Sequence, residues 1–326
     1  MSMTELIDLC WVILGLVTLY YGAEYLVKGA SELALSMGIS PLVVGLTVVA
    51  FGTSAPELVV SVKANLEGNG GMAIGNVVGS NICNIALILG FSSVIFPLQI
   101  HQQVIRRELP ILAAVTLFFA WMIQDGIISR LEGAILFIGV ILYVFSSLKA
   151  ATREPVELPH PEGEGPLDKT PDSQARGKRE LFLNLLLILG GCILLVFGAD
   201  RMVYGGANIA RSFGVSEAVI GLTLFAFGTS LPELATSIVA ALKKQGDLIV
   251  GNAVGSCIFN ILAVVGMTGI IADLAATGIN SVHVAVMIVT SLIILPMMWH
   301  RMVLDRWEGV ILTLGYLCFS TWLIYG

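Results

Sequence analysis

The sequence predicts an all-α membrane protein of ten transmembrane helices, arranged as two inverted five-helix repeats. Three observations lead to this prediction. Of the 326 residues, 56% are hydrophobic and only 12% are charged, whereas an ordinary soluble domain has about 25% charged residues. Apolar stretches of about 20 residues, long enough to cross a bilayer as a helix, recur along the chain. The sequence also contains an internal duplication that relates its two halves.

The apolar stretches predict ten spans. They cover residues 6–27, 41–66, 72–96, 105–123, 131–149, 181–199, 217–242, 248–271, 281–299 and 308–325. Residues 150–180 contain five prolines and many charges, which predicts a flexible linker with too little apolar surface to fold alone. We therefore expect a first repeat over 1–149, a linker over 150–180 and a second repeat over 181–326.

The duplication appears when the chain is shifted by 176 residues. Residues 38–90 then align without a gap on 214–266, with 27 of 53 positions identical. Each half contains five predicted spans, and an odd number makes the second half enter the membrane from the opposite side. Inverted repeats of this kind are typical of secondary transporters.

The placement of Lys and Arg predicts the orientation, because basic residues are enriched in cytoplasmic loops. With the linker in the cytoplasm and both termini outside, thirteen Lys and Arg residues lie inside and four outside. The net charge of −6 adds little, and no basic run with interleaved aromatics suggests nucleic acid.

Two acidic residues occur in the same apolar setting, once in each half. Glu57 lies in FGTSAPELVVS, and Glu233 lies in FGTSLPELATS. A helix from Ser40 to about Leu66 would be about 39 Å long, so Glu57 should lie well inside a hydrocarbon core of about 30 Å. A lone carboxylate there costs a few kcal/mol or more, and no intramembrane Lys or Arg in the matching segments offsets it. A functional role is therefore favoured over a structural one.

The residues around each glutamate offer oxygen ligands. Pro56 and Pro232 interrupt helical hydrogen bonding and release carbonyls near Gly52 and Gly228. Freed backbone is tolerated in a membrane only where protein, water or an ion satisfies it. Hydroxyls add to the set, from Thr53, Ser54, Thr229 and Ser230. Oxygen-rich sites suit hard cations such as Ca²⁺ or Na⁺, and two carboxylates would cancel the charge of one Ca²⁺.

A second motif, GN-x-x-GS-x-x-x-N, opens the third and eighth predicted spans. Ser80 and Asn84 are four residues apart and share a helix face, as do Ser256 and Asn260. These side chains could complete the cation sites. The glycines of the motif are also explained by close helix packing.

Together, GTSAPE and GTSLPE, each followed by GN-x-x-GS-x-x-x-N, resemble the two signature repeats of the calcium/cation antiporter superfamily. The resemblance is closest to the sodium/calcium exchanger branch, including its potassium-dependent members, and covers essentially the whole chain. It implies ten helices in two inverted repeats, with ions bound at the centre by helices two, three, seven and eight.

The resemblance also implies a ligand set. Glu57 and Glu233 would be shared by Ca²⁺ and Na⁺, and Asn84 and Asn260 would line the middle. Backbone carbonyls and hydroxyls would complete the sites, the carbonyls from Thr53, Thr229, Ala50 and Ala226, and the hydroxyls of the flanking Na⁺ sites from Ser54, Ser80, Ser230 and Ser256. Several relatives carry aspartate at one of the two asparagine positions, whereas both are Asn here. This departure bears on stoichiometry and on any K⁺ requirement.

The expected function is exchange of Ca²⁺ for Na⁺ by alternating access in a multi-pass protein of the cell or inner membrane. A Ca²⁺/H⁺ antiporter remains an alternative, because buried carboxylates hold protons readily. A cation channel is also possible, although an inverted repeat with broken helices favours a carrier. An intramembrane hydrolase would need a Ser/His pair, paired aspartates or a zinc motif, and the sequence has no HExxH. We expect no enzymatic activity, no cofactor beyond transported ions, no nucleic acid and no obligate protein partner.

Overall fold

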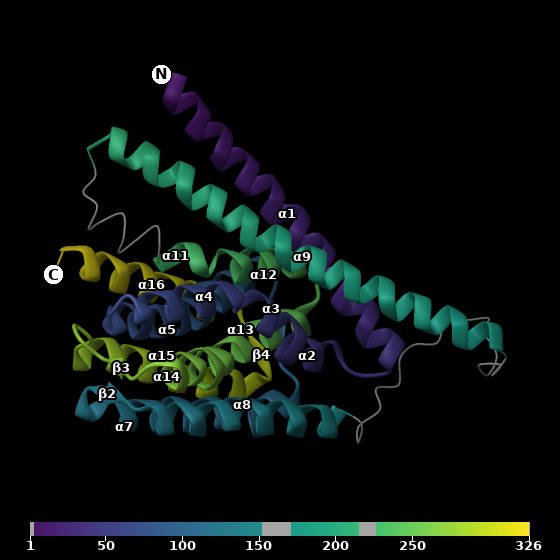
Figure 1. The fold of residues 1–326 in the computed structure, drawn as a ribbon. Helices are drawn as coiled ribbons and strands as arrows, with labels where there is room; N and C mark the ends of the chain where they lie inside the picture. Colours follow the sequence, from purple (N-terminus) through teal and green to yellow (C-terminus); the bar gives the residue numbers. More distant parts are fainter. Residues whose placement is uncertain (1–2, 152–170, 215–225, 326) are drawn as a thin grey trace.

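The computed structural model describes residues 3–151, 171–214 and 226–325, which form a bundle of helices with two very short β-ladders (Figure 1). The first half contains α1 (Met3–Met37), α2 (Pro41–Val44), η1 (Gly45–Val49), α3 (Ala50–Thr53), α4 (Ala55–Leu66), α5 (Gly70–Ile82), η2 (Cys83–Leu89), α6 (Gly90–Ile95), β1 (Leu98–Gln99), η3 (Val104–Glu108), α7 (Leu109–Met122), η4 (Ile123–Asp125), β2 (Ile127–Ile128) and α8 (Arg130–Ala151).

The described part of the second half contains the corresponding elements. They are α9 (Pro171–Ser212), α11 (Ala226–Thr229), α12 (Leu231–Leu242), α13 (Gly246–Phe259), η6 (Asn260–Val265), α14 (Gly266–Ile271), β3 (Leu274–Ala275), α15 (Ser281–Arg301), β4 (Val303–Leu304) and α16 (Arg306–Tyr325). Helices therefore occur at all ten predicted positions, although the start of the seventh predicted span lies outside the described residues.

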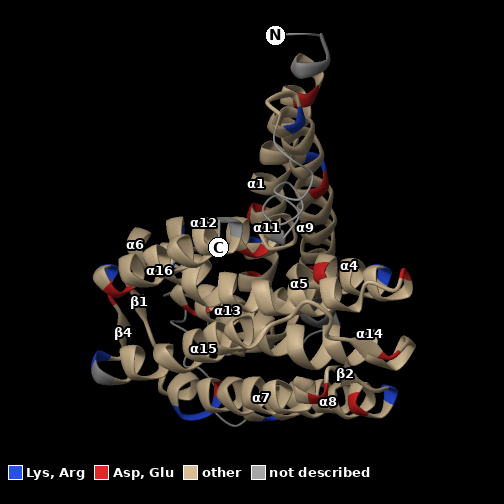
Figure 2. Cartoon of the chain, turned by 90° about the vertical axis from the view of Figure 1, so that its left-hand side faces the viewer, with Lys and Arg blue, Asp and Glu red and all other residues tan. Residues whose placement is uncertain are grey.

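Six helices of the described chain are long and apolar enough to cross a membrane, and a seventh span is gained if the bent pair Pro41–Thr53 and Ala55–Leu66 is counted as one. Charged residues lie mostly at helix ends and along α1 and α9, with tan ribbon through the middle of the bundle (Figure 2). The chain is therefore a mostly helical membrane protein, as the composition predicts.

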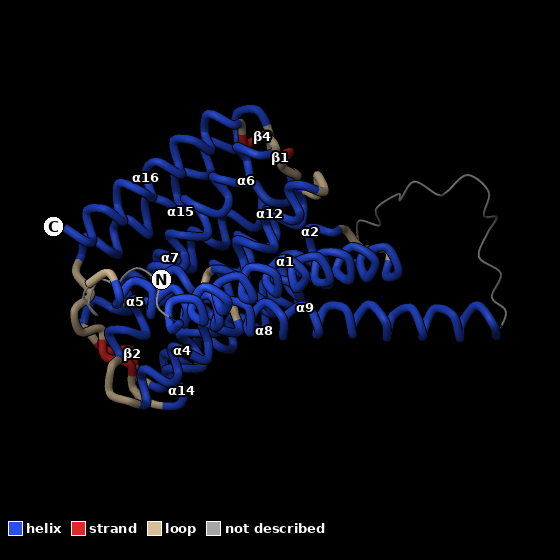
Figure 3. Tube along the Cα trace, turned by 90° about the horizontal axis from the view of Figure 1, so that it is seen from above, coloured by secondary structure: helices blue, strands red, loops and turns tan. Residues whose placement is uncertain are grey.

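The first helix of each half is longer than predicted. α1 continues to Met37 rather than ending near residue 27, and α9 runs from Pro171 to Ser212 instead of covering 181–199. The last ten residues of the predicted linker thus belong to α9, which extends beyond the bundle in Figure 3. Once the apolar part of α9 is helical, adding residues such as Gln, Ala, Arg and Lys costs little.

α1 and α9 pack antiparallel through glycines. A Cβ atom built at Gly22 would lie 2.8 Å from the backbone nitrogen of Leu195, and one built at Gly198 would lie 2.8 Å from the carbonyl oxygen of Gly15. Only glycine permits this approach. As residue numbers rise along α1, those of its contacts on α9 fall. Because α9 is the repeat equivalent of α1, the antiparallel packing is the signature of an inverted pair.

The β-ladders are also related by the inverted repeat. β1 pairs antiparallel with β4, and β2 pairs antiparallel with β3. A shift of 176 residues converts β1 into β3 and β2 into β4, so the two ladders are exchanged by the operation that exchanges the halves. The molecule thus has a pseudo-two-fold axis between its repeats.

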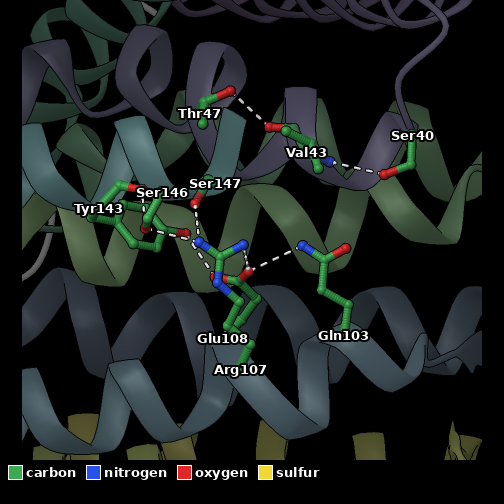
Figure 4. A network of polar contacts seen from close by, with 9 residues as sticks. All are labelled: Ser40, Val43, Thr47, Gln103, Arg107, Glu108, Tyr143, Ser146 and Ser147. Atoms are coloured by element: carbon green, nitrogen blue, oxygen red, sulfur yellow. Dashed lines mark hydrogen bonds and ion pairs between the residues drawn. The ribbon is translucent and has the colours of Figure 1, made fainter. Parts of the chain in front are cut away.

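One buried polar network breaks this symmetry (Figure 4). Glu108 is fully buried, and its carboxylate accepts hydrogen bonds from Gln103 at 3.2 Å and Tyr143 at 3.1 Å, with Arg107 3.7 Å away. The position equivalent to Glu108 in the second half is Val284. The carboxylate is paired, so the network holds η3 against α8.

Candidate ion-binding site

The second and seventh helices break at equivalent serines. α3 ends before Ser54 and α4 begins after it, with a bend of 41° between the two parts. Ser230 separates α11 from α12 in the same way. The ψ angle is 4° at both serines, outside the helical range. Each break precedes a proline that cannot continue the hydrogen-bond ladder. Ser40 caps the start of α2, since the Val43 N–H donates to the Ser40 hydroxyl at 3.4 Å.

The two glutamates lie at these breaks, each beside a serine of the opposite half. Glu57 and Glu233 lie in the first turns of α4 and α12 and are both 0% exposed. The Ser54 hydroxyl donates to Glu233 Oε1 at 3.4 Å, and the Ser230 hydroxyl donates to Glu57 Oε1 at 3.4 Å. Ser80, from α5, donates to the same Glu57 oxygen at 3.4 Å. The exposed N–H groups of a helix start favour negative charge there.

The threonine side chains extend the cluster toward the neighbouring helices. Thr53 donates to Asn252 Oδ1 at 3.1 Å and lies 3.4 Å from the Ser256 hydroxyl. In the other half, Thr229 donates to Asn76 Oδ1 at 3.1 Å. Both threonine hydroxyls are thus directed at asparagine side chains, whereas the resemblance assigned these residues a role through their backbone carbonyls.

Sequence reasoning did not single out Asn76 and Asn252, although both belong to the GN-x-x-GS motif. Asn76 Nδ2 donates to the backbone carbonyl of Glu57 at 3.3 Å, and Asn252 Nδ2 donates to that of Glu233 at 3.4 Å. Each asparagine therefore ties the glutamate of its own half to a threonine of the other. The signal that could have identified them is their occurrence in both copies of the motif, one residue after a glycine.

Several polar atoms at this centre are buried without a hydrogen-bond partner. They are Glu57 Oε2, Glu233 Oε2, Asn260 Oδ1 and both polar side-chain atoms of Asn84. Unpaired buried polar atoms are costly, by about 1–3 kcal/mol each. Four of the five can bind a cation through oxygen. Carboxylate and amide oxygens of this kind are the ligands that a hard-cation site requires.

The backbone carbonyls of Ala50 and Ala226 were also predicted as ligands. The Ala50 carbonyl already accepts the Ser54 N–H at 3.0 Å and the Thr53 hydroxyl at 3.4 Å. Ala226 begins α11, the short helix before the second break. The roles of these two carbonyls, and of the carbonyls of Thr53 and Thr229, stay predictions.

The electrostatics of the cluster are unbalanced. In the described part of the chain, no Lys or Arg forms an ion pair with Glu57 or Glu233. Nor do the described residues contain a group of three or more His, Cys, Asp or Glu side chains that could hold a metal. Two carboxylates surrounded by neutral hydroxyls and amides suit Ca²⁺ or Na⁺ better than zinc or copper.

Comparison with known proteins identifies the family. The profile described as Sodium/calcium exchanger protein matches residues 7–149 and 183–325. The chain belongs to the sodium/calcium exchanger family. The two matches are the two halves, so the duplicated unit is the family's own repeat. Membership makes the chain a cation antiporter of the membrane and not an enzyme, as the sequence predicts.

Relatives cover almost the whole chain. Sodium/calcium exchanger MaX1 of Methanosarcina acetivorans is 33% identical, over 96% of this chain and 97% of that protein. Inner membrane protein YrbG of Escherichia coli is 37% identical, over 94% of this chain and 93% of its own length. Structures of the sodium-calcium exchanger NCX_Mj share the fold. One of them, soaked with Na⁺ and Sr²⁺, has a TM-score of 0.83 and 30% identity, over 98% of this chain and 99% of NCX_Mj.

Proposed function

We propose that this member of the sodium/calcium exchanger family exchanges Ca²⁺ for Na⁺ at a central site built on Glu57 and Glu233. The observation that carries the proposal is the pair of fully buried carboxylates, each with an unpartnered oxygen and neither with a basic partner among the described residues. Two such charges require about two compensating positive charges. One Ca²⁺ or two or more Na⁺ ions supply them.

The neighbouring donors favour Na⁺ as the second substrate. The serine hydroxyls beside the glutamates are neutral oxygen ligands, and so is Asn260 Oδ1. Such groups coordinate a monovalent hard cation without adding charge. Two of the NCX_Mj structures were soaked with Na⁺ together with Sr²⁺ or Ca²⁺, which supports the same pair of ion classes.

Complete burial of the carboxylates requires alternating access. Because neither carboxylate has any exposed surface, an ion reaches the site only when the helices rearrange. An empty site leaves two uncompensated charges in a low-dielectric centre, which penalises crossing without cargo. This coupling produces exchange rather than leak, and it favours a carrier over an open channel.

The decisive experiment uses purified protein in liposomes. We expect ⁴⁵Ca²⁺ uptake when vesicles loaded with Na⁺ are diluted into Na⁺-free medium, and no uptake when a pH gradient is imposed without Na⁺. Uptake driven by the pH gradient alone would replace Na⁺ with H⁺ as the exchanged ion. Uptake under neither gradient would refute Ca²⁺ exchange.

We also propose a cell or inner membrane location, with both termini outside and the 150–180 segment in the cytoplasm. The inner membrane name of YrbG and the distribution of basic residues support this. Single cysteines introduced near Gly68 and Gly278, in loops predicted to lie outside, should react with a membrane-impermeant maleimide added to intact cells, after the native cysteines are replaced. Labelling only after lysis would reverse the orientation.

A further inference from the structure

Asn81 and Cys257 occupy equivalent positions in the two halves and touch each other. Asn81 Nδ2 donates to the backbone carbonyl of Cys257 at 3.2 Å, and Cys257 Sγ donates to the backbone carbonyl of Asn81 at 3.7 Å. Equivalent residues in mutual contact lie on the pseudo-two-fold axis. Both residues are fully buried. On the pseudo-two-fold axis, the protein therefore carries an asparagine carboxamide from the first half and a cysteine thiol from the second.

This contact fixes the orientation of two amide groups in series. A backbone carbonyl only accepts hydrogen bonds, so the NH₂ group of Asn81 must face Cys257. The oxygen of Asn81 then points toward Asn260, whose Nδ2 donates to it at 3.1 Å. Asn260 must consequently direct its oxygen the other way, and this buried Oδ1 has no hydrogen-bond partner.

The equivalent side chain in the first half is not held in this way. Asn84 in the first half corresponds to Asn260 in the second. The repeat therefore relates the pair Asn260 and Asn81 to the pair Asn84 and Cys257, and Cys257 has no amide oxygen. Both Oδ1 and Nδ2 of Asn84 are buried without a hydrogen bond. A thiol is only a weak donor and acceptor, so it cannot select one orientation of the Asn84 amide as firmly.

We propose that Asn81 is a positioning residue of the cation site, which orients the Asn260 carboxamide so that its oxygen and not its nitrogen faces the bound cation. Reversed, the same side chain would present a positive NH₂ edge to the ion. The site thus has one oriented amide oxygen, from Asn260, and one adaptable amide, from Asn84. This inference rests on the proposed cation site and deepens it.

A double-mutant cycle tests the proposal. Asn81→Cys places in the first half the residue found at the equivalent position of the second half. We expect it to raise the half-saturating Ca²⁺ concentration of Ca²⁺/Ca²⁺ counterflow about tenfold, the effect of about one hydrogen bond. In an Asn260→Asp background the same change should alter that concentration less than twofold, because a carboxylate presents oxygen in either orientation.

Asn84→Asp provides the matched control, since no hydrogen bond joins Asn84 to Asn81 in the structure. The tenfold effect of Asn81→Cys should persist in that background. An equal effect in all three backgrounds would reduce Asn81 to a structural residue and overturn the proposal, as would no effect in any of them. If Asn81→Cys does not fold, Asn81→Ser, which also lacks the amide, replaces it in the cycle.

Transport measurements on the wild-type protein distinguish a failure of this inference from a failure of the proposed function. Wild-type protein that carries no Ca²⁺ would refute the proposed Ca²⁺ exchange. The same cycle would then be read from Na⁺-dependent thermal stabilisation, again with coupling to Asn260 and not to Asn84 as the expected result. Wild-type protein that responds to neither ion would overturn both.

Discussion

The hydroxyl of Ser230 lies 3.4 Å from the Glu57 carboxylate, although 173 residues separate the two in the chain. Ser54 and Glu233 repeat this contact across the pseudo-two-fold axis at the same distance. Each glutamate is therefore held by a hydroxyl from the opposite half. Neither repeat contains a complete site, which gives a physical reason for keeping both copies of the motif.

The crossed serines should control the response to Na⁺. Ser54→Ala or Ser230→Ala removes a neutral oxygen ligand and a hydrogen bond to a carboxylate. We expect each to raise the half-saturating Na⁺ concentration for ⁴⁵Ca²⁺ efflux by about 3–10-fold. Ser36→Ala is the control, because Ser36 is exposed and donates only within its own helix. Unchanged Na⁺ dependence in both test variants would exclude the serines from the Na⁺ sites.

Asn76 and Asn252 should stabilise the protein as well as the site. Replacing either with alanine removes the amide donor to a glutamate backbone carbonyl and the amide oxygen that accepts from a threonine hydroxyl. A loss of about 1–3 kcal/mol in the free energy of unfolding is expected for each variant. Denaturant unfolding in detergent, without Ca²⁺ or Na⁺, measures it. Stability equal to that of the wild type would show that these bonds are replaced by others.

The ion pair between Glu24 and Lys243 should bias the access states. Its N–O distance is 2.6 Å, and it joins α1 to the end of α12. The equivalent residues, Asp200 and Glu67, are both acidic and cannot form the reciprocal pair. Because the pair is about one-third exposed, it contributes no more than about 1 kcal/mol.

Lys243→Gln should therefore shift the balance between inward- and outward-open states by about 2–5-fold. Distances between spin labels on α1 and α12 would report the two populations. Reversing the charges, with Glu24→Lys and Lys243→Glu together, should restore the wild-type distribution. If the double reversal behaves like Lys243→Gln, the contact acts by shape and not by charge.

Tyr143→Phe should destabilise the protein without changing ion affinity. It removes the hydrogen bond to Glu108 Oε2 and leaves that buried oxygen unpaired. We expect a loss of about 1–3 kcal/mol in unfolding free energy. The half-saturating Ca²⁺ concentration should stay within twofold of wild type. A larger change would connect the Glu108 network to transport.

Much of the fold was predictable because hydropathy and duplication can both be read directly from the sequence. The two prolines predict the breaks before Glu57 and Glu233, and the apolar surroundings predict the burial of both carboxylates. The predicted ends of α1 and α9 were wrong, because polar residues extend each helix beyond its apolar part. A hydropathy pattern does not record that extension.

The site was predictable as a set of residue types and not as a set of contacts. The motif gives Ser80 and Asn84 a common helix face, but it does not reveal that Asn252 bridges Thr53 and Glu233. Such contacts depend on the register between helices far apart in sequence. The buried Glu108 also escaped prediction, because its partners come from two different helices and its repeat equivalent is apolar.

The central claim is that Glu57 and Glu233 bind the transported ions. The most direct test is to measure Ca²⁺ transport by variants in which each glutamate is replaced by glutamine. ⁴⁵Ca²⁺ uptake under an outward Na⁺ gradient should fall to background in Glu57→Gln and in Glu233→Gln. Glu108→Gln removes an equally buried carboxylate that already has partners, and it should retain uptake in the fraction that folds. Substantial uptake by either of the first two variants would contradict the account.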